Sequence, residues 1–293
     1  MASWSPLVVR EWSVIVHGGA KTIRPERQVV NRAGCEEAAR EAAAVLDGGG
    51  SAVEAVEAAI RALEDNPTFN AGLGSVRNAD GDVEMDAAIM NGSDLALGSV
   101  AALRDVRNPI SVAKALLRDK AAMLVGVGAD RFAAEIGTEL RAAGATSDVP
   151  VDETCNTVGC VAFDQDGHIA AGASTGGLDG VRVGRVGDTP IPGCGLYAED
   201  GVGGISFSGD GESILRLALA GRIMASLSAL DVQQAANAGI SQMARVGGEA
   251  GCILLDSAGR PAFAHNSQHF AVATANPRQG VRAFLHFKEF VDV

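Results

Sequence analysis

The chain has 293 residues, 47% of them hydrophobic and 4% aromatic, and a formal net charge of −12. This length predicts one large α/β domain or two tightly joined halves, and we expect a single domain over residues 1–293 with an aliphatic core. The acidity argues against a nucleic-acid partner, and no apolar run is long enough for a membrane span. The first residues lack the pattern of a secretory signal, and five widely spaced cysteines indicate reduced thiols, so we expect a cytoplasmic location.

Hydrophobic periodicity predicts alternating helices and strands in the first half. The clearest helix is predicted within the segment 51–67, where Ser51 and Glu54 form a capping box and Pro67 lies beyond the helix end. The other helices are predicted at 31–47, from Pro109 onward and at 130–144, and the strands at 12–20, 82–90 and 97–103. Residues 69–76 read as a glycine-punctuated loop.

A polar segment over residues 145–156 resembles a linker, and the pattern restarts at Thr157. Two strands joined by the turn "DQDG" predict a hairpin over residues 157–174. A glycine-rich stretch follows at 176–211, then helices at 212–227 and 230–244, then a second hairpin at 251–265. Hairpins flanked by helices indicate sheets packed face to face with helices outside.

Thr157 lies where the polar linker becomes an apolar strand, in "ETCNTVGCVAFD". A threonine hydroxyl needs a base to act as a nucleophile, and its own α-amino group has a pKa of about 7.7–8.0. That base exists only if the Asn156–Thr157 bond is cut. From these features alone, a β-branched residue opening a strand remains the simpler interpretation.

Seven motifs in order change this balance: "VHGGA" (16–20), "FNAGLGSV" (69–76), "VEMDAAIMNG" (83–92), "TVGCVAFD" (157–164), "STGG" (174–177), "GRVGDTP" (184–190) and "GDGES" (209–213). Together the chain resembles the isoaspartyl peptidase/L-asparaginase family of threonine N-terminal-nucleophile hydrolases. The resemblance implies a four-layer αββα sandwich with largely antiparallel sheets. It also implies self-cleavage into an α subunit, residues 1–156, and a β subunit, residues 157–293.

The implied reaction is the hydrolysis of β-aspartyl dipeptides and L-asparagine to release L-aspartate. In this resemblance Thr157 is the nucleophile, and Thr175 hydrogen-bonds to it; the alternative for Thr175 is a turn hydroxyl. Arg185 and Asp188 suit the carboxylate and the ammonium group of an amino-acid substrate. Taken alone, these two residues favour the interpretation as a surface ion pair.

The oxyanion site is implied by the pair that follows the long glycine-rich stretch. Here that pair is Ser208 and Gly209, where relatives have threonine and glycine, and the serine keeps the hydroxyl. Gly209 and Gly211 would line the substrate pocket with backbone groups. Asn70 would support this region from the first half of the chain, and a loop-capping asparagine is an equal interpretation.

The resemblance implies no cofactor for catalysis, but it does imply a structural sodium ion. Hard oxygen ligands suit such an ion. The implied ligands are backbone carbonyls in "LEDNPTFNAGL", at Leu63, Glu64, Asn66, Phe69, Ala71 and Leu73.

Two features depart from the resemblance, and two other functions stay open. Asn156 stands where relatives commonly have glycine, which adopts unusual backbone dihedrals more readily, and the linker is short. We expect a homodimer of uncleaved chains, or an (αβ)2 assembly after cleavage, that acts on small molecules. The alternatives are a glycosylasparaginase-like hydrolase and an uncleaved, non-catalytic protein that binds amino acids.

Overall fold

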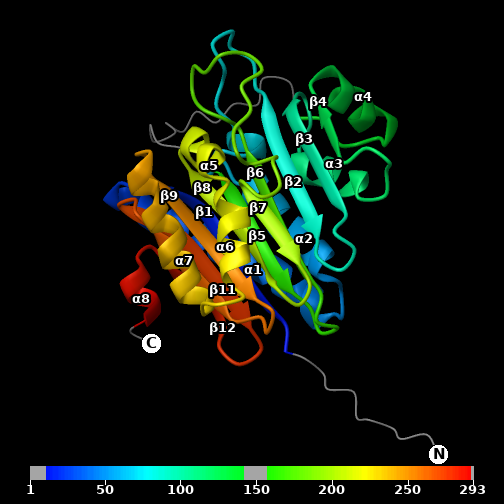
Figure 1. Cartoon of the computed structure of the whole chain (residues 1–293). Helices are drawn as coiled ribbons and strands as arrows, with labels where there is room; N and C mark the ends of the chain where they lie inside the picture. The colour runs from blue at the N-terminus through cyan, green and yellow to red at the C-terminus, as the bar shows by residue number, and fades with distance from the viewer. Residues whose placement is uncertain (1–10, 142–156, 292–293) are drawn as a thin grey trace, which may run out of the picture.

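The computed structural model describes residues 11–141 and 157–291, and the strands of these ranges form two sheets (Figure 1). One sheet has eight strands in the order β12-β11-β1-β5-β6-β2-β3-β4, and the other has four in the order β10-β9-β8-β7. Every neighbouring pair is antiparallel except β3 with β4. The prediction of helices combined with largely antiparallel sheets is therefore confirmed.

The strands of the larger sheet are β1 (Ser13–Lys21), β2 (Met85–Asn91), β3 (Leu97–Leu103), β4 (Met123–Val125), β5 (Val158–Phe163), β6 (Ile169–Thr175), β11 (His269–Asn276) and β12 (Gly280–Phe284). Those of the smaller sheet are β7 (Leu196–Glu199), β8 (Gly203–Gly209), β9 (Ala250–Asp256) and β10 (Pro261–His265).

The helices are α1 (Pro25–Asp47), α2 (Ala52–Glu64), α3 (Pro109–Leu116), α4 (Val127–Glu135), α5 (Gly211–Leu217), α6 (Leu219–Ser226), α7 (Val232–Ser241) and α8 (Phe287–Val291), with 3₁₀ turns at Gly72–Gly74 and Gln242–Arg245. In the described ranges none of these helices has the length and apolar character that a membrane crossing requires.

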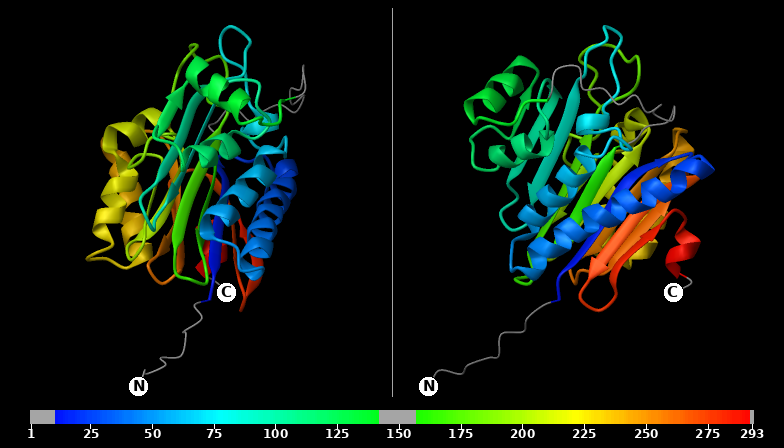
Figure 2. Two further views of the ribbon diagram at one scale, coloured as in Figure 1. Left: turned by 90° about the vertical axis from the view of Figure 1, so that its right-hand side faces the viewer. Right: turned by 180° about the vertical axis from the view of Figure 1, so that it is seen from behind.

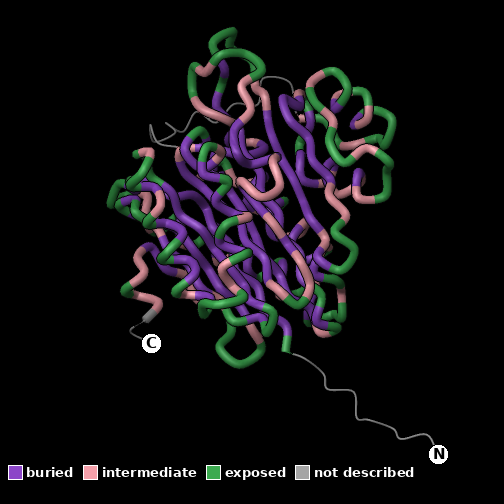
Figure 3. Tube along the Cα trace, in the orientation of Figure 1, coloured by how far each residue is buried: buried purple, intermediate pink, exposed green. Residues whose placement is uncertain are grey.

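Helices cover the outer face of each sheet (Figure 2). Helices α1 and α2 pack against the larger sheet, and α6 and α7 pack against the smaller one. The inner faces of the two sheets contact each other, through β1 with β9 and through β5 and β6 with β8. The strands are accordingly buried along most of their length, and exposed residues gather on the helices and loops (Figure 3).

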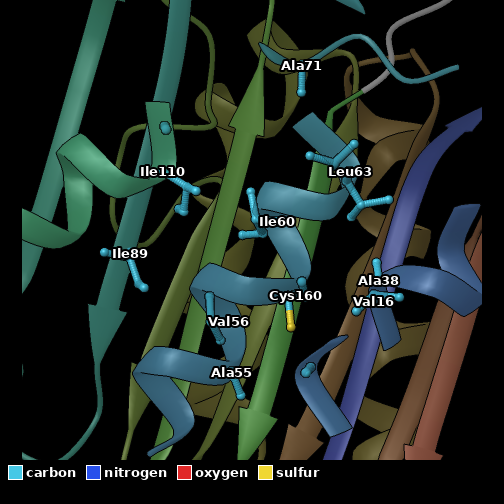
Figure 4. Close-up of a cluster of buried hydrophobic side chains, with 14 of the residues drawn as sticks. Val16, Ala38, Ala55, Val56, Ile60, Leu63, Ala71, Ile89, Ile110 and Cys160 are labelled. Carbon is cyan, nitrogen blue, oxygen red and sulfur yellow. The ribbon is translucent and has the colours of Figure 1, made fainter. Parts of the chain in front are cut away.

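The packing of α2 shows how the sequence directs this arrangement. Ser51 caps the helix as predicted, because its hydroxyl accepts a hydrogen bond from the Glu54 amide and the Glu54 carboxylate accepts one from the Ser51 amide. Val56, Ile60 and Leu63 then recur on one face and are fully buried against the sheet (Figure 4). Each such side chain contributes about 1.5–3 kcal/mol relative to an exposed one.

Both predicted hairpins are confirmed, as β5–β6 and as β9–β10. Two predicted helices are wrong in their extent. The helix expected over 130–144 ends at Glu135, because Gly137 adopts the left-handed conformation (φ 69°). The helix expected over 212–227 is divided into α5 and α6 by Ala218, which is also left-handed (φ 49°). The predicted linker 145–156 and the cleavage residue Asn156 lie outside the described residues.

Candidate active site

Thr157 directly precedes β5, at the end of the strand that lies in the middle of the larger sheet. Its side chain is buried, with 6% of the residue exposed. The antiparallel register joins Val158 to Ser174, and one further step of this register sets Thr157 opposite Thr175, the last residue of β6. The structure thus brings together the predicted nucleophile and its predicted partner.

The hydroxyl of Thr157 also meets a residue that the sequence analysis did not single out. Its Oγ1 lies 3.5 Å from Oγ1 of Thr189, and Thr189 is almost fully buried. Thr189 follows Asp188 directly, so this contact places the long glycine-rich loop against the end of β5. The signal was present in the motif "GDTP", but a threonine in a loop has many other roles.

His17, on the neighbouring strand β1, is paired with Gly159, two residues after Thr157, and is fully buried. Burial lowers the pKa of its imidazole to about 3, although the nearby carbonyl of Thr157 acts to raise it. The ring is therefore neutral at pH 7. Its Nε2 lies 3.3 Å from the Ser206 hydroxyl of β8, so this contact joins the two sheets.

The Thr175 hydroxyl accepts a hydrogen bond from the Gly177 amide at 3.2 Å. Asn70 anchors the same turn, because its Nδ2 donates to the Gly177 carbonyl at 2.7 Å and its Oδ1 accepts from the Val76 amide at 3.0 Å. The turn-stabilising role that the sequence left open for each residue is therefore present. Thr175 also lies opposite Thr157 in the register of β5 with β6.

Arg185, Asp188 and Gly211 converge on one small space, although 26 positions separate the first from the last. A methyl group placed on Gly211 would lie 2.8 Å from Asp188 Oδ1 and 3.0 Å from Arg185 Nη2. Only glycine allows the two charged side chains to approach the backbone this closely. The guanidinium also binds Glu212 in bidentate fashion, with Nε to Oε1 at 2.9 Å and Nη2 to Oε2 at 2.7 Å.

The Asp188 carboxyl is the most unusual group of this space. It is buried, with 4% of the residue exposed, and its Oδ2 makes no hydrogen bond with the described residues. Burial raises the pKa of this carboxyl to about 7, while its own backbone amide and the Arg185 guanidinium act to lower it. A buried oxygen without a donor is costly, so the arrangement favours a ligand that supplies one, and an ammonium group supplies both donors and charge.

Ser208 and Gly209 end strand β8, two residues before Gly211. The Ser208 hydroxyl accepts a hydrogen bond from the Ala20 amide of β1 at 3.0 Å and is fully buried. Gly209 has a φ of 148°, and a methyl group there would lie 2.2 Å from the Glu249 carbonyl. The pair has a clear structural role between the sheets, and the Ser208 hydroxyl retains a proton to donate.

Asp86 is a further buried acid that the sequence analysis quoted within a motif but gave no role. Burial raises the pKa of its carboxyl to about 6, while the Ala102 amide and the Arg185 guanidinium act to lower it. The Ala102 amide donates to its Oδ1 at 2.9 Å. Together with Glu212 and Asp188, Asp86 surrounds Arg185 with carboxylates.

The loop after α2 brings backbone carbonyl oxygens close together, as a cation site requires. A methyl group on Gly74 would lie 2.1 Å from the Phe69 carbonyl, and one on Gly72 would lie 2.5 Å from the Glu64 carbonyl, so the chain curls tightly around its own carbonyl oxygens. Such uncharged oxygen donors suit a hard monovalent cation. The Leu73 carbonyl differs, because it accepts a hydrogen bond from the Arg141 guanidinium at 2.8 Å.

Four other carbonyls among the implied ligands accept hydrogen bonds from backbone amides. Leu63 accepts from the Asn66 amide, Asn66 accepts from Phe69, and Phe69 accepts from Ala71. Ala71 in turn accepts from the Gly74 amide. A carbonyl oxygen has two lone pairs, so each of these atoms can still ligate a cation.

A threonine at the head of a central strand, a second threonine opposite it and a nearby space lined by an arginine and a buried aspartate fit the class of amide hydrolases with a strand-opening nucleophile. The comparisons with known proteins agree. The family model described as "Asparaginase" matches residues 10–147 and 140–283, and the chain belongs to this family.

Three relatives show the extent of the similarity. The isoaspartyl peptidase/L-asparaginase of Rattus norvegicus is 40% identical over 270 residues, which covers 84% of this chain and 80% of that protein. Its counterpart in Xenopus laevis is 41% identical over 84% of this chain and 86% of its own length. The plant-type L-asparaginase of Pyrococcus horikoshii is 41% identical over 89% of this chain and 95% of its own length.

Proposed function

We propose that the protein is a threonine amidohydrolase that releases L-aspartate from isoaspartyl dipeptides and from L-asparagine. The observation that carries this proposal is the contact between the hydroxyls of Thr157 and Thr189. It brings Thr189 against the proposed nucleophile, and the preceding residue, Asp188, has a buried Oδ2 that makes no hydrogen bond with the described residues. The names of the relatives, isoaspartyl peptidase/L-asparaginase and plant-type L-asparaginase, support the same substrate class.

In the proposed reaction, the substrate's α-carboxylate binds Arg185 and its α-ammonium binds Asp188. The Thr157 hydroxyl then attacks the side-chain carbonyl carbon of the substrate, and its proton passes to the α-amino group of Thr157. The negative oxygen that forms is stabilised by the Ser208 hydroxyl and the Gly209 amide. The same proton then passes to the departing nitrogen, the carbon–nitrogen bond breaks, and an aspartyl ester remains on Thr157. Water, deprotonated by the same amine, hydrolyses this ester.

This mechanism requires a free α-amino group on Thr157, so we propose self-cleavage of the bond to Asn156. The products would be an α subunit of residues 1–156 and a β subunit of residues 157–293. The position of Thr157 supports this proposal, because β5 holds the new terminus in the middle of the sheet through its pairs with β1 and β6.

For the architecture, we infer the four-layer αββα sandwich of the N-terminal-nucleophile hydrolases. The contacts of α1 and α2 with the larger sheet, of the larger with the smaller sheet, and of the smaller sheet with α6 and α7 support this inference. The pairing of β5 with its neighbours gives such a sandwich a central strand on which to present the nucleophile.

We further propose that the loop carbonyls of Leu63, Glu64, Asn66, Phe69, Ala71 and Leu73 hold a structural sodium ion. The close approach of Gly72 and Gly74 to two of these carbonyls supports it. Such an ion would fix the loop that carries Asn70. Replacement of sodium by a bulky organic cation should then lower the thermal midpoint, and an unchanged midpoint would count against the site.

We also propose a cytoplasmic homodimer, as uncleaved chains or as (αβ)2 after cleavage. The four cysteines of the described residues are free thiols, and Cys35, Cys160 and Cys252 are buried, which suits a reducing compartment. Sedimentation velocity before and after cleavage tests the assembly.

The central experiment measures aspartate release from β-aspartyl-leucine and from L-asparagine, together with the intact mass of the protein. We expect fragments of 156 and 137 residues and hydrolysis that grows with the cleaved fraction. Thr157→Ala should stay full-length and inactive while its circular dichroism matches the parental protein. A folded Thr157→Ala variant with parental turnover would refute the proposal.

A further inference from the structure

Thr189 presents a buried hydroxyl to the proposed nucleophile. Its Oγ1 lies 3.5 Å from Oγ1 of Thr157, and 1% of the residue is exposed. Within the described residues, the Thr189 hydroxyl has no other hydrogen-bond partner. The contact joins the loop between β6 and β7 to the head of β5, although 32 positions separate the two threonines.

The backbone around Thr189 is held on two sides. On one side, the Ser99 hydroxyl of β3 donates a hydrogen bond to the Pro190 carbonyl at 2.6 Å. On the other side, a methyl group placed on Gly195 would lie 2.8 Å from the Cα atom of Thr189, so the two backbones pack closely. Gly195 is itself tied to β8, because its carbonyl accepts from the Phe207 amide at 2.8 Å. Thr189 therefore has a fixed place relative to both sheets.

The same short turn carries the proposed site for the substrate's ammonium group. Asp188 directly precedes Thr189, and the Ile191 amide closes the turn by donating to the Asp188 carbonyl at 3.0 Å. The Oδ2 atom of Asp188 makes no hydrogen bond with the described residues. One peptide unit thus links the carboxyl proposed to hold the substrate to a hydroxyl that lies against the nucleophile.

The proposed mechanism determines which of the two hydroxyls donates, since the contact allows either direction. A hydroxyl carries one proton and two acceptor lone pairs. Thr157 gives its proton to its own α-amino group, so its Oγ1 accepts in the contact with Thr189. The second lone pair of this oxygen stays available for the attack on the substrate.

We infer that Thr189 is a positioning residue, whose hydroxyl donates to Oγ1 of Thr157 and selects the rotamer in which the nucleophile faces the substrate. This inference rests on the proposed function. A side chain has three staggered positions about its first bond, and only one of them points Oγ1 in a given direction. Selecting that position raises the rate of the chemical step without changing how the substrate's charged groups are bound. The effect should therefore appear in kcat and not in KM.

The test compares Thr189→Val and Thr189→Ser with the parental protein on β-aspartyl-leucine. Valine has nearly the shape of threonine but no hydroxyl, whereas serine keeps the hydroxyl. For Thr189→Val we expect kcat per cleaved chain, counted from the intact mass, to fall about 10- to 100-fold. KM should change by less than about threefold, because the groups that bind the substrate stay in place. Thr189→Ser should keep most of the parental kcat.

The matched control is Thr274→Val on β11, which removes the hydroxyl of another buried threonine of the larger sheet. Thr274 pairs with Ile15, and Ile15 pairs with Val161, so the control lies farther along the sheet than Thr157. It should leave kcat and KM at their parental values. A parental kcat in Thr189→Val, or an equal loss of kcat in Thr189→Ser, would overturn the inference.

The side-chain conformation of Thr157 separates this inference from the proposed function. In protein with labelled threonine methyl groups, the couplings of the Thr157 methyl carbon to the backbone report χ1 and require no turnover. We expect a single rotamer in the parental protein and in Thr274→Val, and averaged couplings in Thr189→Val. If the parental protein hydrolyses neither β-aspartyl-leucine nor L-asparagine, the proposed function fails, while this difference would still support the positioning role. Identical couplings in the parental protein and in Thr189→Val would reject it.

Discussion

Asp86 and Thr175 are direct partners in the antiparallel pairing of β2 with β6. Since the register of β5 with β6 sets Thr157 opposite Thr175, these three residues form a row across three neighbouring strands. Asp86 therefore lies at the same end of the sheet as Thr157, the proposed nucleophile. Its negative charge acts to raise the pKa of Asp188, the carboxyl proposed to bind the substrate's ammonium group.

Asp86→Asn should shift the pH profile of L-aspartate binding toward lower pH. The amide oxygen can still accept the hydrogen bond from Ala102, but the charge that hinders the ionisation of Asp188 is gone. We expect the affinity at pH 7 to change by less than about tenfold, because the two groups interact indirectly. Calorimetry between pH 5 and pH 8 measures this. Asp164→Asn is the control, because Asp164 is also buried and also accepts from a backbone amide, that of Ala52, at the far end of β5. A profile that moves equally in both variants would contradict the argument.

Asp188 itself should give the binding reaction its pH dependence. Its raised pKa of about 7 means that the free protein carries a protonated carboxyl below this pH, which cannot pair with an ammonium group. Affinity for L-aspartate should therefore rise as pH increases toward 7 and level off above it, and Asp188→Asn should flatten the profile.

Acetylation of the α-amine of β-aspartyl-leucine should reduce kcat/KM by about 10²-fold or more. The acetylated amine carries no charge, so Asp188 would stay buried without a partner. Equal turnover of the acetylated and free substrates would remove this role.

The local signals of the sequence predicted the parts of the fold that neighbouring residues determine. The capping box at Ser51, the turn after Phe163 and the strand over 97–103 depend on residues within a few positions, and the structure confirms them. Strands β7 and β8 were missed because both lie in the glycine-rich stretch 176–211. Strand β8 is held in the sheet by its pairing with β9, more than 40 positions away in the chain, and such a long-range contact leaves no local signal.

The site was predictable to the extent that it lies in contiguous motifs. Thr157, Arg185 and Asp188 follow from such motifs, and the structure places the last two together with Gly211. Thr189 and Asp86 also lie in quoted motifs, but the motifs do not indicate what these two side chains contact. Their place in the site comes from a hydroxyl contact across the loop and from a strand register, which only the folded chain shows.

Ala218→Gly should stabilise the protein, and it tests the break between α5 and α6. Ala218 is left-handed, at φ 49° and ψ 52°, and its side chain is exposed. In the folded protein this conformation costs a non-glycine residue about 1–2 kcal/mol, which glycine would not lose. Glycine also gives the unfolded chain more conformational freedom, and this lowers the expected gain in stability by about 0.4–1 kcal/mol. Ala225→Gly, at an exposed position inside α6, should instead destabilise by about 1 kcal/mol. Urea unfolding measures both, and a destabilised Ala218→Gly variant would contradict the assignment of strain to this residue.

His17 should make the folded state sensitive to acid. Its pKa is about 3 in the folded protein and 6.5 as its ordinary value, so between these pH values the unfolded chain binds a proton that the folded chain does not. The free energy of unfolding should then fall by at most about 1.4 kcal/mol per pH unit as pH decreases below 6.5. In the uncleaved Thr157→Ala background, His17→Gln should reduce this slope. His168→Gln is the control of opposite sign, because the hydrogen bond to Asp200 raises the pKa of His168 and favours the folded state at low pH. An equal slope in His17→Gln and its parent would reject the neutral, buried imidazole.

Thr157→Ser and Thr175→Ala should separate the two steps that the proposed mechanism assigns to this end of the sheet. Serine keeps the hydroxyl and loses the methyl group that restricts the side-chain rotamer, so self-cleavage and hydrolysis should both continue at reduced rates. Thr175→Ala keeps the nucleophile but removes the hydroxyl opposite it. We expect kcat to fall about 10²-fold with a smaller change in KM, because Arg185 and Asp188 still bind the substrate. Intact mass reports cleavage, and aspartate release from the cleaved fraction reports turnover. Thr175 also accepts a hydrogen bond from Gly177, so a general loss of the loop would raise KM for L-asparagine as strongly as it lowers kcat. That result would assign Thr175 to the turn alone, whereas a loss confined to kcat would place its hydroxyl in the chemistry of Thr157.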